Sequence, residues 1–429
     1  MLAGDKISTG SVSGRGDSSP IIGGCLDLGI STPDGYVLVA EQMSEQQVDF
    51  VVLMEDRQPD FFLTFNRFNP ESFVRLNRHG PSAYYPTQND LRSFVKAFHE
   101  KGIRIMYGFW VHENRWITMR HPELLLTDCT GAKWHTDDFA ADFNPLLDMN
   151  QDDYGVKSGE KFSDHVCRQY SKISDAFGFD GLFLGDGGMG FRRFGDDTAG
   201  VNRYDYSHKA IRKFLKSSYY NGHSNCAVQQ AGKSDTLNYI DTAADIWSAH
   251  WQDWIKWNCS EWAEFYRRIA GYVHSSGGKL AAYSCMNYGP TQAIMHGVDY
   301  GLIAQAGLDF LVFQTYDYAW RQHFGLANKD VMTNVRELAS LCAYLSGSET
   351  EVLFTAETAD EVEKWKCPLE HTLNQTMRYS AAGLSLQHLE SSGRQENYKA
   401  ASLSGAFIVW LNHTPFEDIA QIRRAAGCA

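Results

Sequence analysis

The chain has 429 residues and a net charge of −13, and aromatic side chains make up 13% of it. No basic stripe runs along the sequence, and no apolar stretch reaches the roughly 18 residues of a membrane span. Nucleic acid and a membrane are therefore excluded as expected partners. The nine cysteines are scattered and form no C-x-x-C pair. We therefore expect neither a disulfide framework nor a zinc site, and no cofactor.

Residues 1–20 are rich in Gly and Ser and poor in large apolar side chains. Such a segment buries too little surface to offset its ordering entropy, so we expect a flexible arm ahead of a single domain at residues 21–429. The start lacks the apolar core of a secretory signal. This predicts a cytoplasmic protein, or a secreted one if a signal has been trimmed, in which case the sequons at Asn258, Asn374 and Asn412 would matter.

From Ile21 onward, short β-rich runs alternate with amphipathic helical stretches. Eight strands and eight helices in alternation predict a closed (β/α)₈ barrel, the TIM-barrel fold, better than an open doubly wound sheet. The expected strands are Ile21–Leu28, Phe61–Phe65, Ile103–Trp110, Gly181–Gly185, Lys279–Ser284, Phe310–Thr315, Glu351–Thr355 and Leu384–Leu389. The expected helices are Tyr36–Met54, Asn89–Lys101, Lys161–Ala176, Ile240–Ser275, Gln292–Ala306, Val331–Leu345, Val362–Ala381 and Lys399–Leu411.

The longest insertion, Gly187–Asp241, follows the fourth strand, and we expect it to form a lid or a subsite wall over the barrel. We find no internal repeat. Four tryptophans at helical spacing, Trp251, Trp254, Trp257 and Trp262, are expected to pack against neighbouring elements in the long helix after this insertion.

Reacting groups in such a barrel lie at the carboxyl ends of the strands. Three of the expected strand ends carry an acid: Asp186 after the fourth, Asp317 after the sixth and Glu357 after the seventh. Each could instead be a solvated or salt-bridged loop acid. The three are the candidate catalytic residues.

The run from Gly178 to Asp186, GFDGLFLGD, resembles the fourth-strand motif of retaining glycoside hydrolases. It is similar to the α-galactosidase and α-glucosidase clan, and to the dextranase and cycloisomaltooligosaccharide glucanotransferase family. In those families the last Asp of an F-D-G-x-x-x-x-D run is the nucleophile, which implies that role for Asp186. The passage Asn89–Gly108 into the third strand, and the loop His121-Pro122-Glu123 followed by Gly131, Lys133 and Trp134, are also similar to glycosidase-like barrels. The resemblance covers residues 84–320 in pieces.

The second carboxylate is less clearly assigned. The dextranase-like family has a later Glu as acid/base, whereas the fifth strand here ends Tyr283-Ser284-Cys285-Met286-Asn287 without an acid. The α-galactosidase clan takes its acid/base from an Asp after the sixth strand, which implies Asp317. Among Tyr316, Tyr318 and Trp320, partial desolvation would help Asp317 to keep its proton. Glu357 is the rival, because acids on the fourth and seventh strands also pair in barrel glycosidases.

Sugar-binding residues are expected near the same strand ends. Aromatic rings stack on the apolar faces of sugars, and amide, imidazole and guanidinium groups bind hydroxyls. The stacking candidates are Trp110, Trp116, Tyr316 and Trp320, and the polar candidates are Asn66, Arg67, His112 and Asn287. Arg192 could bind a carboxylate or sulfate on the sugar, or be a solvated cation.

Three other classes of function were weighed. Gly185–Gly190 matches the G-x-G-x-x-G of a dinucleotide site, but the sequence that follows does not read as a helix. A metal-dependent hydrolase is disfavoured because the first strand, ending Cys25-Leu26-Asp27, lacks an H-x-H motif. A non-catalytic sugar-binding barrel remains open. We expect a glycosidase or transglycosidase that acts on an oligo- or polysaccharide with retention of configuration, a pair of carboxylates doing the chemistry.

Overall fold

The computed structural model describes residues 19–55, 61–74, 85–111, 114–133, 149, 156, 159–185, 204–220, 238–284, 289–315, 331–357, 367–391 and 403–427. Eight parallel strands form a closed barrel in chain order, with the eighth paired to the first. This confirms the predicted TIM barrel. The strands are β1 (Ile21–Leu26), β2 (Phe50–Met54), β3 (Arg104–Trp110), β4 (Gly181–Gly185), β5 (Lys279–Tyr283), β6 (Phe310–Phe313), β7 (Glu351–Ala356) and β8 (Leu403–Ile408).

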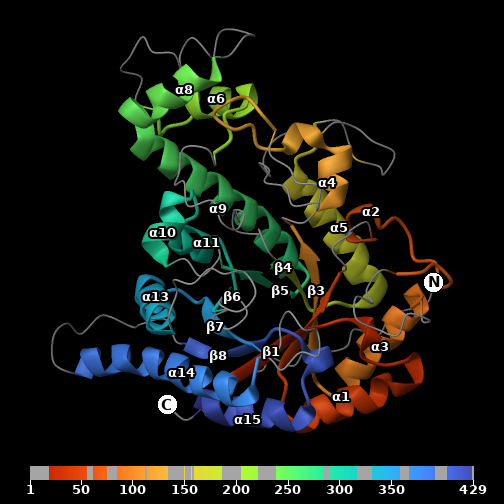
Figure 1. Cartoon of the computed structure of the whole chain (residues 1–429). Coiled ribbons are helices and arrows are strands. Elements are labelled where there is room, and N and C mark those ends of the chain that lie inside the picture. The colour runs from red at the N-terminus through yellow and green to blue at the C-terminus, as the bar shows by residue number, and fades with distance from the viewer. Residues whose placement is uncertain are drawn as a thin grey trace.

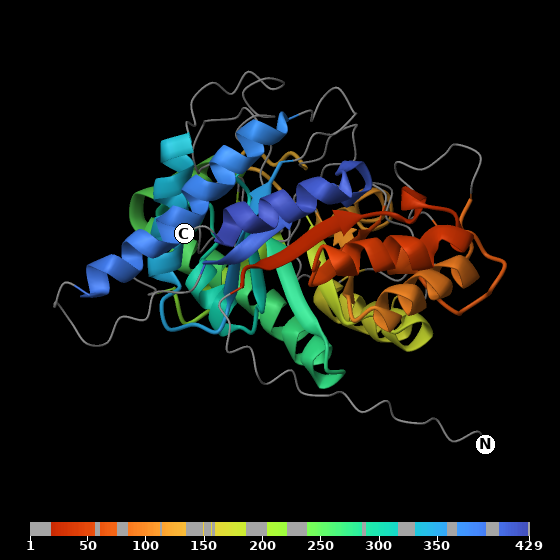
Figure 2. The same ribbon diagram turned by 90° about the horizontal axis from the view of Figure 1, so that it is seen from below.

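Helices surround the strands on the outside of the barrel (Figures 1 and 2). The longer ones are α1 (Tyr36–Glu45), α3 (Gln88–Glu100), α5 (Phe162–Phe177), α9 (Trp251–Ser275), α13 (Val331–Tyr344), α14 (Leu369–Ser391) and α15 (Phe416–Gly427). The shorter ones are α2 (Phe61–Thr64), α4 (Arg115–Arg120), α6 (His208–Leu215), α8 (Tyr239–Asp245), α10 (Pro290–Met295) and α11 (Tyr300–Gln305). Within the described part of the chain, no helix combines the length and the apolar character needed to cross a membrane.

Local signals explain several helix boundaries. A capping box opens α3, in which the Thr87 hydroxyl accepts from the Asp90 amide and the Asp90 carboxylate accepts from the Thr87 amide at 2.8 Å. Gly178 ends α5 in the left-handed conformation, with φ at 83°, which glycine adopts at little cost. The chain then turns directly into β4.

Two predicted strands are wrong. All five residues of β2, Phe50–Met54, are buried, as expected for a parallel strand covered on both faces, so its apolar run looked like the end of the preceding helix. Phe61–Phe65 instead begins the short helix α2, because the Glu55 carboxylate accepts from the amides of Phe61 and Phe62 and caps it.

The eighth strand was misplaced in the same way. Leu384–Leu389, with its alternating apolar and polar residues, lies inside α14, and the strand is Leu403–Ile408. The predicted helices Tyr36–Met54 and Lys399–Leu411 are therefore wrong over the residues of β2 and β8. The predicted helix Gln292–Ala306 is two short helices, α10 and α11.

Side chains fill the inside of the barrel. The ring of Phe50 on β2 stacks on that of Phe310 on β6, with centroids 5.2 Å apart. The ring of Phe183 on β4 stacks on that of Phe407 on β8, with centroids 5.4 Å apart. These strands lie opposite one another, so rings from both sides meet on the barrel axis. The interior is a packed core, to which each buried ring contributes about 1.5–3 kcal/mol.

An aspartate stands directly before β2, β4 and β6 and fixes the register of each strand against the one before it. Its Oδ2 atom accepts a hydrogen bond from a backbone amide at the start of the preceding strand. The three pairs are Asp49 with Ile22, Asp180 with Ile105 and Asp309 with Leu280, at 2.8, 2.7 and 2.8 Å. Each carboxylate also lies near a basic group, namely Arg423, His99 and His274 respectively. This end of the barrel is held by a repeated polar contact.

A separate hydrophobic cluster lies beyond the barrel and its surrounding helices. It joins the described part of the insertion after β4, including α6, to α8 and the amino-terminal half of α9. These helices lie at the top of Figure 1. Trp254 and Trp257 are buried in it, as predicted, whereas the exposed ring of Trp251 does not fit the prediction. Of the arm expected at residues 1–20, residues 1–18 lie outside the described residues. A single domain and a lid stay predictions.

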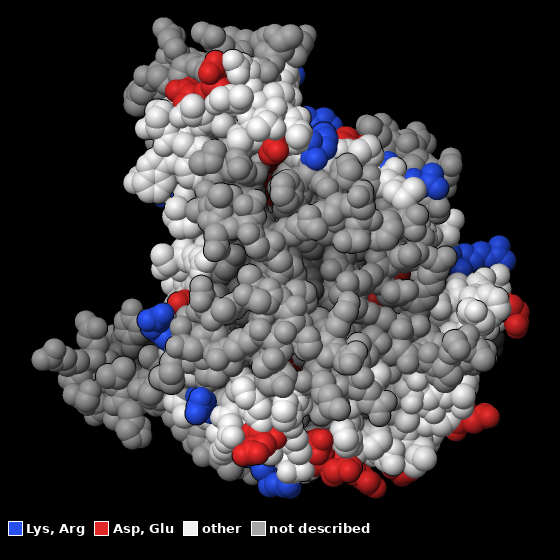
Figure 3. All heavy atoms as spheres, viewed as in Figure 1, with Lys and Arg blue, Asp and Glu red and all other residues white. Residues whose placement is uncertain are grey.

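Charged side chains are dispersed around the edge of the face seen in Figure 3. Acidic side chains gather along the edge formed by α1 and α15, where Glu41, Glu417 and Asp418 are found. On the described part of this face, Lys and Arg form no continuous stripe.

Candidate active site at the carboxyl ends of the strands

Three buried acids follow strands of the barrel. Asp27 comes directly after β1, Glu55 after β2 and Glu357 after β7, and their residues are 0%, 0% and 5% exposed. The carboxyl ends of neighbouring parallel strands meet at one end of a barrel, so these acids belong to the end where barrel enzymes bind their substrates. Of the three, only Glu357 was predicted from the sequence as a catalytic residue.

Asp27 connects the ends of β1 and β8. Its Oδ1 atom accepts from the amide of Gly29 at 2.7 Å and from Asn412 Nδ2 at 3.0 Å. In return, Asn412 Oδ1 accepts from the amide of Asp27 at 2.9 Å. Asn412 follows β8, so this reciprocal pair ties the first strand to the last at the carboxyl end of the barrel.

Glu55 shapes the turn after β2. Besides capping α2 through its carboxylate, it accepts a hydrogen bond at its backbone carbonyl from Trp110 Nε1 at 2.8 Å. Burial, together with the charge of the nearby Glu55, raises the pKa of Tyr107 well above its usual value. The hydrogen bond to the Glu55 carbonyl positions Trp110 at the end of β3. Trp110 is 5% exposed and packs with the aromatic side chains inside the barrel.

Polar side chains continue around the ends of β5, β6 and β7. The Thr315 hydroxyl donates to the carbonyl of Thr355 at 2.7 Å, and the Thr315 amide donates to the Thr355 hydroxyl at 2.8 Å. The amide of Gln314 donates to the hydroxyl of Ser284 at 3.0 Å. These four residues are buried. Their mutual hydrogen bonds hold the segments that lead towards the candidate acids Asp317 and Glu357.

Glu357 lies beside two other groups that can bind a metal. A carboxylate oxygen of Glu357, the thiol of Cys367 and an imidazole nitrogen of His371 lie within 4.8 Å of one another. The backbone carbonyl of Glu357 accepts a hydrogen bond from the hydroxyl of Thr372. Within the described part of the chain, this is the one group of three such side chains that could hold an ion.

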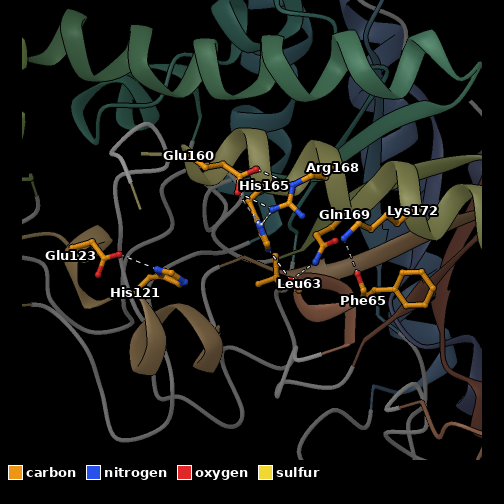
Figure 4. Close-up of polar contacts among 9 residues, drawn as sticks. All are labelled: Leu63, Phe65, His121, Glu123, Glu160, His165, Arg168, Gln169 and Lys172. Atoms are coloured by element: carbon orange, nitrogen blue, oxygen red, sulfur yellow. Dashed lines mark hydrogen bonds and ion pairs between the residues drawn. The ribbon is translucent and has the colours of Figure 1, made fainter. Parts of the chain in front are cut away.

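Polar side chains on α5 contact backbone carbonyls at the end of α2, the short helix that follows β2 (Figure 4). His165 Nε2 lies 2.8 Å from the carbonyl of Leu63, Gln169 donates to the same carbonyl, and Lys172 donates to the carbonyl of Phe65 at 3.4 Å. These side chains satisfy carbonyls at the end of α2 that would otherwise lack partners. Arg168 is fixed by a two-pronged contact with the carboxylate of Glu160, at 3.0 and 2.8 Å.

The HPE loop that resembled glycosidase-like barrels lies next to these polar side chains of α5, with the ring of Trp116 between them. His121 is fully buried, and its Nδ1 atom lies 2.9 Å from the Glu123 carboxylate. The ring of Trp116 stacks on His165, with centroids 5.0 Å apart, and tilts over His121. Trp116 is only 2% exposed within the core between sheet and helices. The prediction that it stacks on a sugar is therefore wrong, because its faces are taken by imidazole rings.

Asn66 and Arg67 were expected at the end of the second strand. They lie just after α2, because the Phe-rich segment is a helix, and both are exposed. Their role in sugar binding stays a prediction, without the strand-end position that first suggested it. The remaining predicted site residues lie outside the described residues: Asp186, Asp317, His112, Arg192, Asn287, Tyr316 and Trp320.

No protein-family model matches the sequence, and no curated protein is significantly similar to it. Solved structures with a similar fold include a family GH20 exo-β-N-acetylglucosaminidase from Vibrio harveyi, with a TM-score of 0.46 and 11% identity over 95% of this chain and 54% of that one. A β-galactosidase from the psychrophilic Marinomonas ef1 has a TM-score of 0.49 and 11% identity, over 95% of this chain and 59% of that one. A cycloisomaltooligosaccharide glucanotransferase from Paenibacillus sp. has a TM-score of 0.46 and 10% identity, over 81% of this chain and 40% of that one. This chain thus spans about half the length of the first of these structures. Identities this low describe the fold alone.

Proposed function

We propose that this chain is a glycoside hydrolase or transglycosidase that acts on an oligo- or polysaccharide with retention of configuration. Asp186 is the nucleophile and Asp317 the general acid/base. The observation that carries the proposal is the course of β4. Within the run that resembles glycoside hydrolases, Gly181–Gly185 forms β4 of the closed barrel, so Asp186 is the first residue beyond the carboxyl end of this strand.

The order of the strands suits this pair of acids. One strand, β5, separates β4 from β6, and adjacent strands lie roughly 4.8 Å apart, so the two backbones are about 10 Å apart. Two aspartate side chains that point towards each other shorten this distance to the roughly 5–9 Å found between paired glycosidase carboxylates. The short end of that range corresponds to retention.

The proposal requires the chain to turn after Gly185. Within β4, Phe183 lies inside the barrel, whereas Leu182 and Leu184 pack outward against the helices. A straight continuation would give position 186 the outward direction of Leu184. The sequence Gly185-Asp186-Gly187-Gly188 permits a turn at this point, because glycines adopt conformations closed to other residues.

The described strand ends are filled by the protein's own side chains. Trp110 and Trp410 cover the inner aromatic core near the ends of β3 and β8, and they are 5% and 7% exposed. The hydroxyl and amide groups at the ends of β5 to β7 are buried and hydrogen-bonded to one another. We therefore expect the stacking rings and polar groups that bind the sugar to lie further out, on the loops after the strands. Glu357 is the alternative acid/base, but the adjacent Cys367 and His371 favour another role for it.

The test compares two aspartates at opposite ends of the same strand. Aryl α- and β-glycosides and oligosaccharides are offered to the wild type and to Asp186→Asn, Asp317→Asn and Glu357→Gln, with Asp180→Asn as the matched control. We expect Asp186→Asn to lower kcat/KM by about 10³-fold or more without loss of folding, as removal of a reacting carboxylate does. Asp180→Asn, at the amino end, should leave kcat unchanged. Proton NMR of the first product reports the anomeric configuration.

The proposal fails if Asp186→Asn turns over substrate as fast as Asp180→Asn does. Oligosaccharide binding by the wild type, with no turnover of any substrate in the panel, would instead favour a non-catalytic carbohydrate-binding barrel. Loss of activity in Glu357→Gln but not in Asp317→Asn would transfer the acid/base role to Glu357.

A further inference from the structure

Three metal-binding side chains of different chemistry meet where β7 leads to α14. Glu357 is the residue directly after β7, Cys367 lies just before α14, and His371 lies in the first turn of that helix. One ligand atom from each lies within 4.8 Å of the other two. Cys367 is 1% and Glu357 5% exposed, and His371 is half-buried.

We propose that Glu357, Cys367 and His371 bind a divalent transition-metal ion of the zinc type. Thiolate, imidazole and carboxylate together suit Zn²⁺, whereas Mg²⁺ and Ca²⁺ select oxygen ligands alone. Zinc–ligand distances of roughly 2.0–2.3 Å in a tetrahedron place neighbouring ligand atoms about 3.3–3.6 Å apart. Small side-chain rotations that move each ligand atom by about 1 Å bring the three atoms into that range. Three protein ligands leave a fourth position for water or a substrate oxygen.

Two further side chains already orient these ligands. The Thr372 hydroxyl lies 3.3 Å from Cys367 Sγ and donates to the carbonyl of Glu357, so it connects the two buried ligands. The amide nitrogen of Gln375 lies 2.7 Å from His371 Nε2. With this amide turned over, its oxygen would accept from the Nε2–H of His371 and leave Nδ1 to bind the ion. Metal sites commonly hold their ligands in this way, and loss of such a partner typically costs 10–100-fold in affinity.

The ligand spacing follows from the geometry of α14. Cys367, His371 and Gln375 are four residues apart in succession, which places His371 and Gln375 on one face of the helix and Cys367 at its entrance. The pattern C-x₃-H differs from the C-x-x-C spacing whose absence argued against zinc in the sequence analysis. The third ligand, Glu357, comes from the end of β7, so no short sequence motif contains the whole site.

The evidence for this site does not rest on the proposed glycosidase chemistry. A bound ion would connect β7 to α14 and would occupy the Glu357 carboxylate, which removes that residue as a rival to Asp317 for acid/base catalysis. Because metal binding is observed by spectroscopy, a negative result would not touch the proposed glycosidase activity. A positive result would not depend on that activity either.

The experiment uses the full chain, reduced and stripped of metal with a chelator, and titrates it with Co²⁺ followed by Zn²⁺. We expect one Co²⁺ per chain, a thiolate-to-cobalt charge-transfer band in the near ultraviolet and the intense visible bands of four-coordinate cobalt. Zn²⁺ should displace Co²⁺ and raise the thermal unfolding midpoint, because an ion that binds only the folded state stabilises it.

Cys367→Ala should abolish the charge-transfer band, and Gln375→Ala should weaken binding by about 10-fold. Cys342→Ala is the matched control. Cys342 on α13 is also 1% exposed, and burial raises the pKa of its thiol to about 12, so we expect the control to bind cobalt like the wild type. Circular dichroism checks the folding of each variant.

The proposal is wrong if the folded wild type gives no charge-transfer band, if Cys367→Ala keeps it, or if Cys342→Ala loses it as well. Should Cys367→Ala fail to fold, His371→Ala and Glu357→Gln decide the question. Each must weaken cobalt binding by at least about 100-fold, more than the loss of a supporting partner would. Unchanged affinity in either variant would also overturn the proposal.

Discussion

The two ends of the barrel use buried and half-buried acids in different ways. At the amino end, Asp49, Asp180 and Asp309 occupy equivalent positions and make the same contact, a hydrogen bond from the amide of the preceding strand. At the carboxyl end, no two of the described acids have the same surroundings. Asp27 pairs with an asparagine, and Glu55 caps a helix. Repetition at one end indicates a role in the fold, and variety at the other leaves room for chemistry.

The two ends of β4 show this difference within one short motif. Asp180 and Asp186 both belong to the run that resembles glycoside hydrolases. The structure gives Asp180 a purely architectural set of partners, the amide of Ile105 and the ring of His99. The first acid of such a motif can therefore match for reasons of folding, and only the second acid carries information about function.

The largest effect expected at the amino end is on stability. The side chain of Asp49 is 8% exposed, and its replacement by Ala removes the acceptor of the Ile22 amide and a partner of Arg423, which lies 3.3 Å away. A hydrogen bond to a charged group contributes about 1.5–3 kcal/mol, so we expect Asp49→Ala to lower the free energy of unfolding by about 2–3 kcal/mol. Urea denaturation measures this loss.

The activity of Asp49→Ala, measured where the variant is still folded, should equal that of the wild type. Asp34→Ala is the control, because Asp34 is exposed and its loss should change the free energy of unfolding by no more than about 0.5 kcal/mol. An Asp49→Ala variant that is as stable as this control would show that the repeated contact does not hold the barrel.

A smaller effect is expected where the carboxyl end closes. Asn412→Ala removes the side-chain hydrogen bonds between Asn412 and Asp27, the two shortest at 2.9 and 3.0 Å, and should cost about 1–2 kcal/mol of stability. Because Asp27 lies at the end where substrate is expected, kcat/KM should fall as well, unlike in Asp49→Ala. Calorimetry and steady-state kinetics measure the two quantities.

Asn412→Asp sharpens this result. It keeps an acceptor for the Asp27 amide but places a second carboxylate 3.0 Å from the first, so it should destabilise the protein more than Asn412→Ala does. Equal stability of the two variants would mean that Asp27 does not carry a negative charge in the folded protein.

The fold could largely be predicted from the alternation of strands and helices, and six of the eight strands were placed correctly. The two errors have one cause. β2 is apolar on both faces and α14 contains an alternating segment, so the local pattern at both places points to the wrong element. A signal that could have placed β2 was overlooked. An apolar residue, an aspartate and an apolar strand recur at Val48-Asp49-Phe50, Phe179-Asp180-Gly181 and Leu308-Asp309-Phe310.

The candidate site was less accessible to sequence reasoning. Glu55 was missed because its strand was taken for a helix, and Asp27 was considered only as part of an absent H-x-H motif. Glu357 was found from its place after β7, but its neighbours Cys367 and His371 come from the next helix, so their proximity depends on tertiary structure. The burial of Trp116 between two imidazole rings is likewise set by packing between α4 and α5.

The smallest expected effect is a pH-dependent change in stability at one of the three amino-end contacts, the pair of His99 and Asp180. A hydrogen bond from the His99 ring to Asp180 raises the pKa of His99, which lies 2.7 Å from the carboxylate. A raised pKa in the folded state adds stability that is fully present below the unfolded value of about 6.5 and is lost as the pH rises through the folded pKa.

Wild type should therefore exceed His99→Gln in stability at pH 5–6, and the difference should shrink as His99 loses its proton. Both side chains are about one-third exposed, at 37% and 35%, so the difference should stay below about 1 kcal/mol and decrease in high salt. Thermal unfolding of both proteins across this pH range measures it. A difference that grew towards high pH would mean that the neutral ring makes the stabilising contact, and Asp180 would then hold β4 through the Ile105 amide alone.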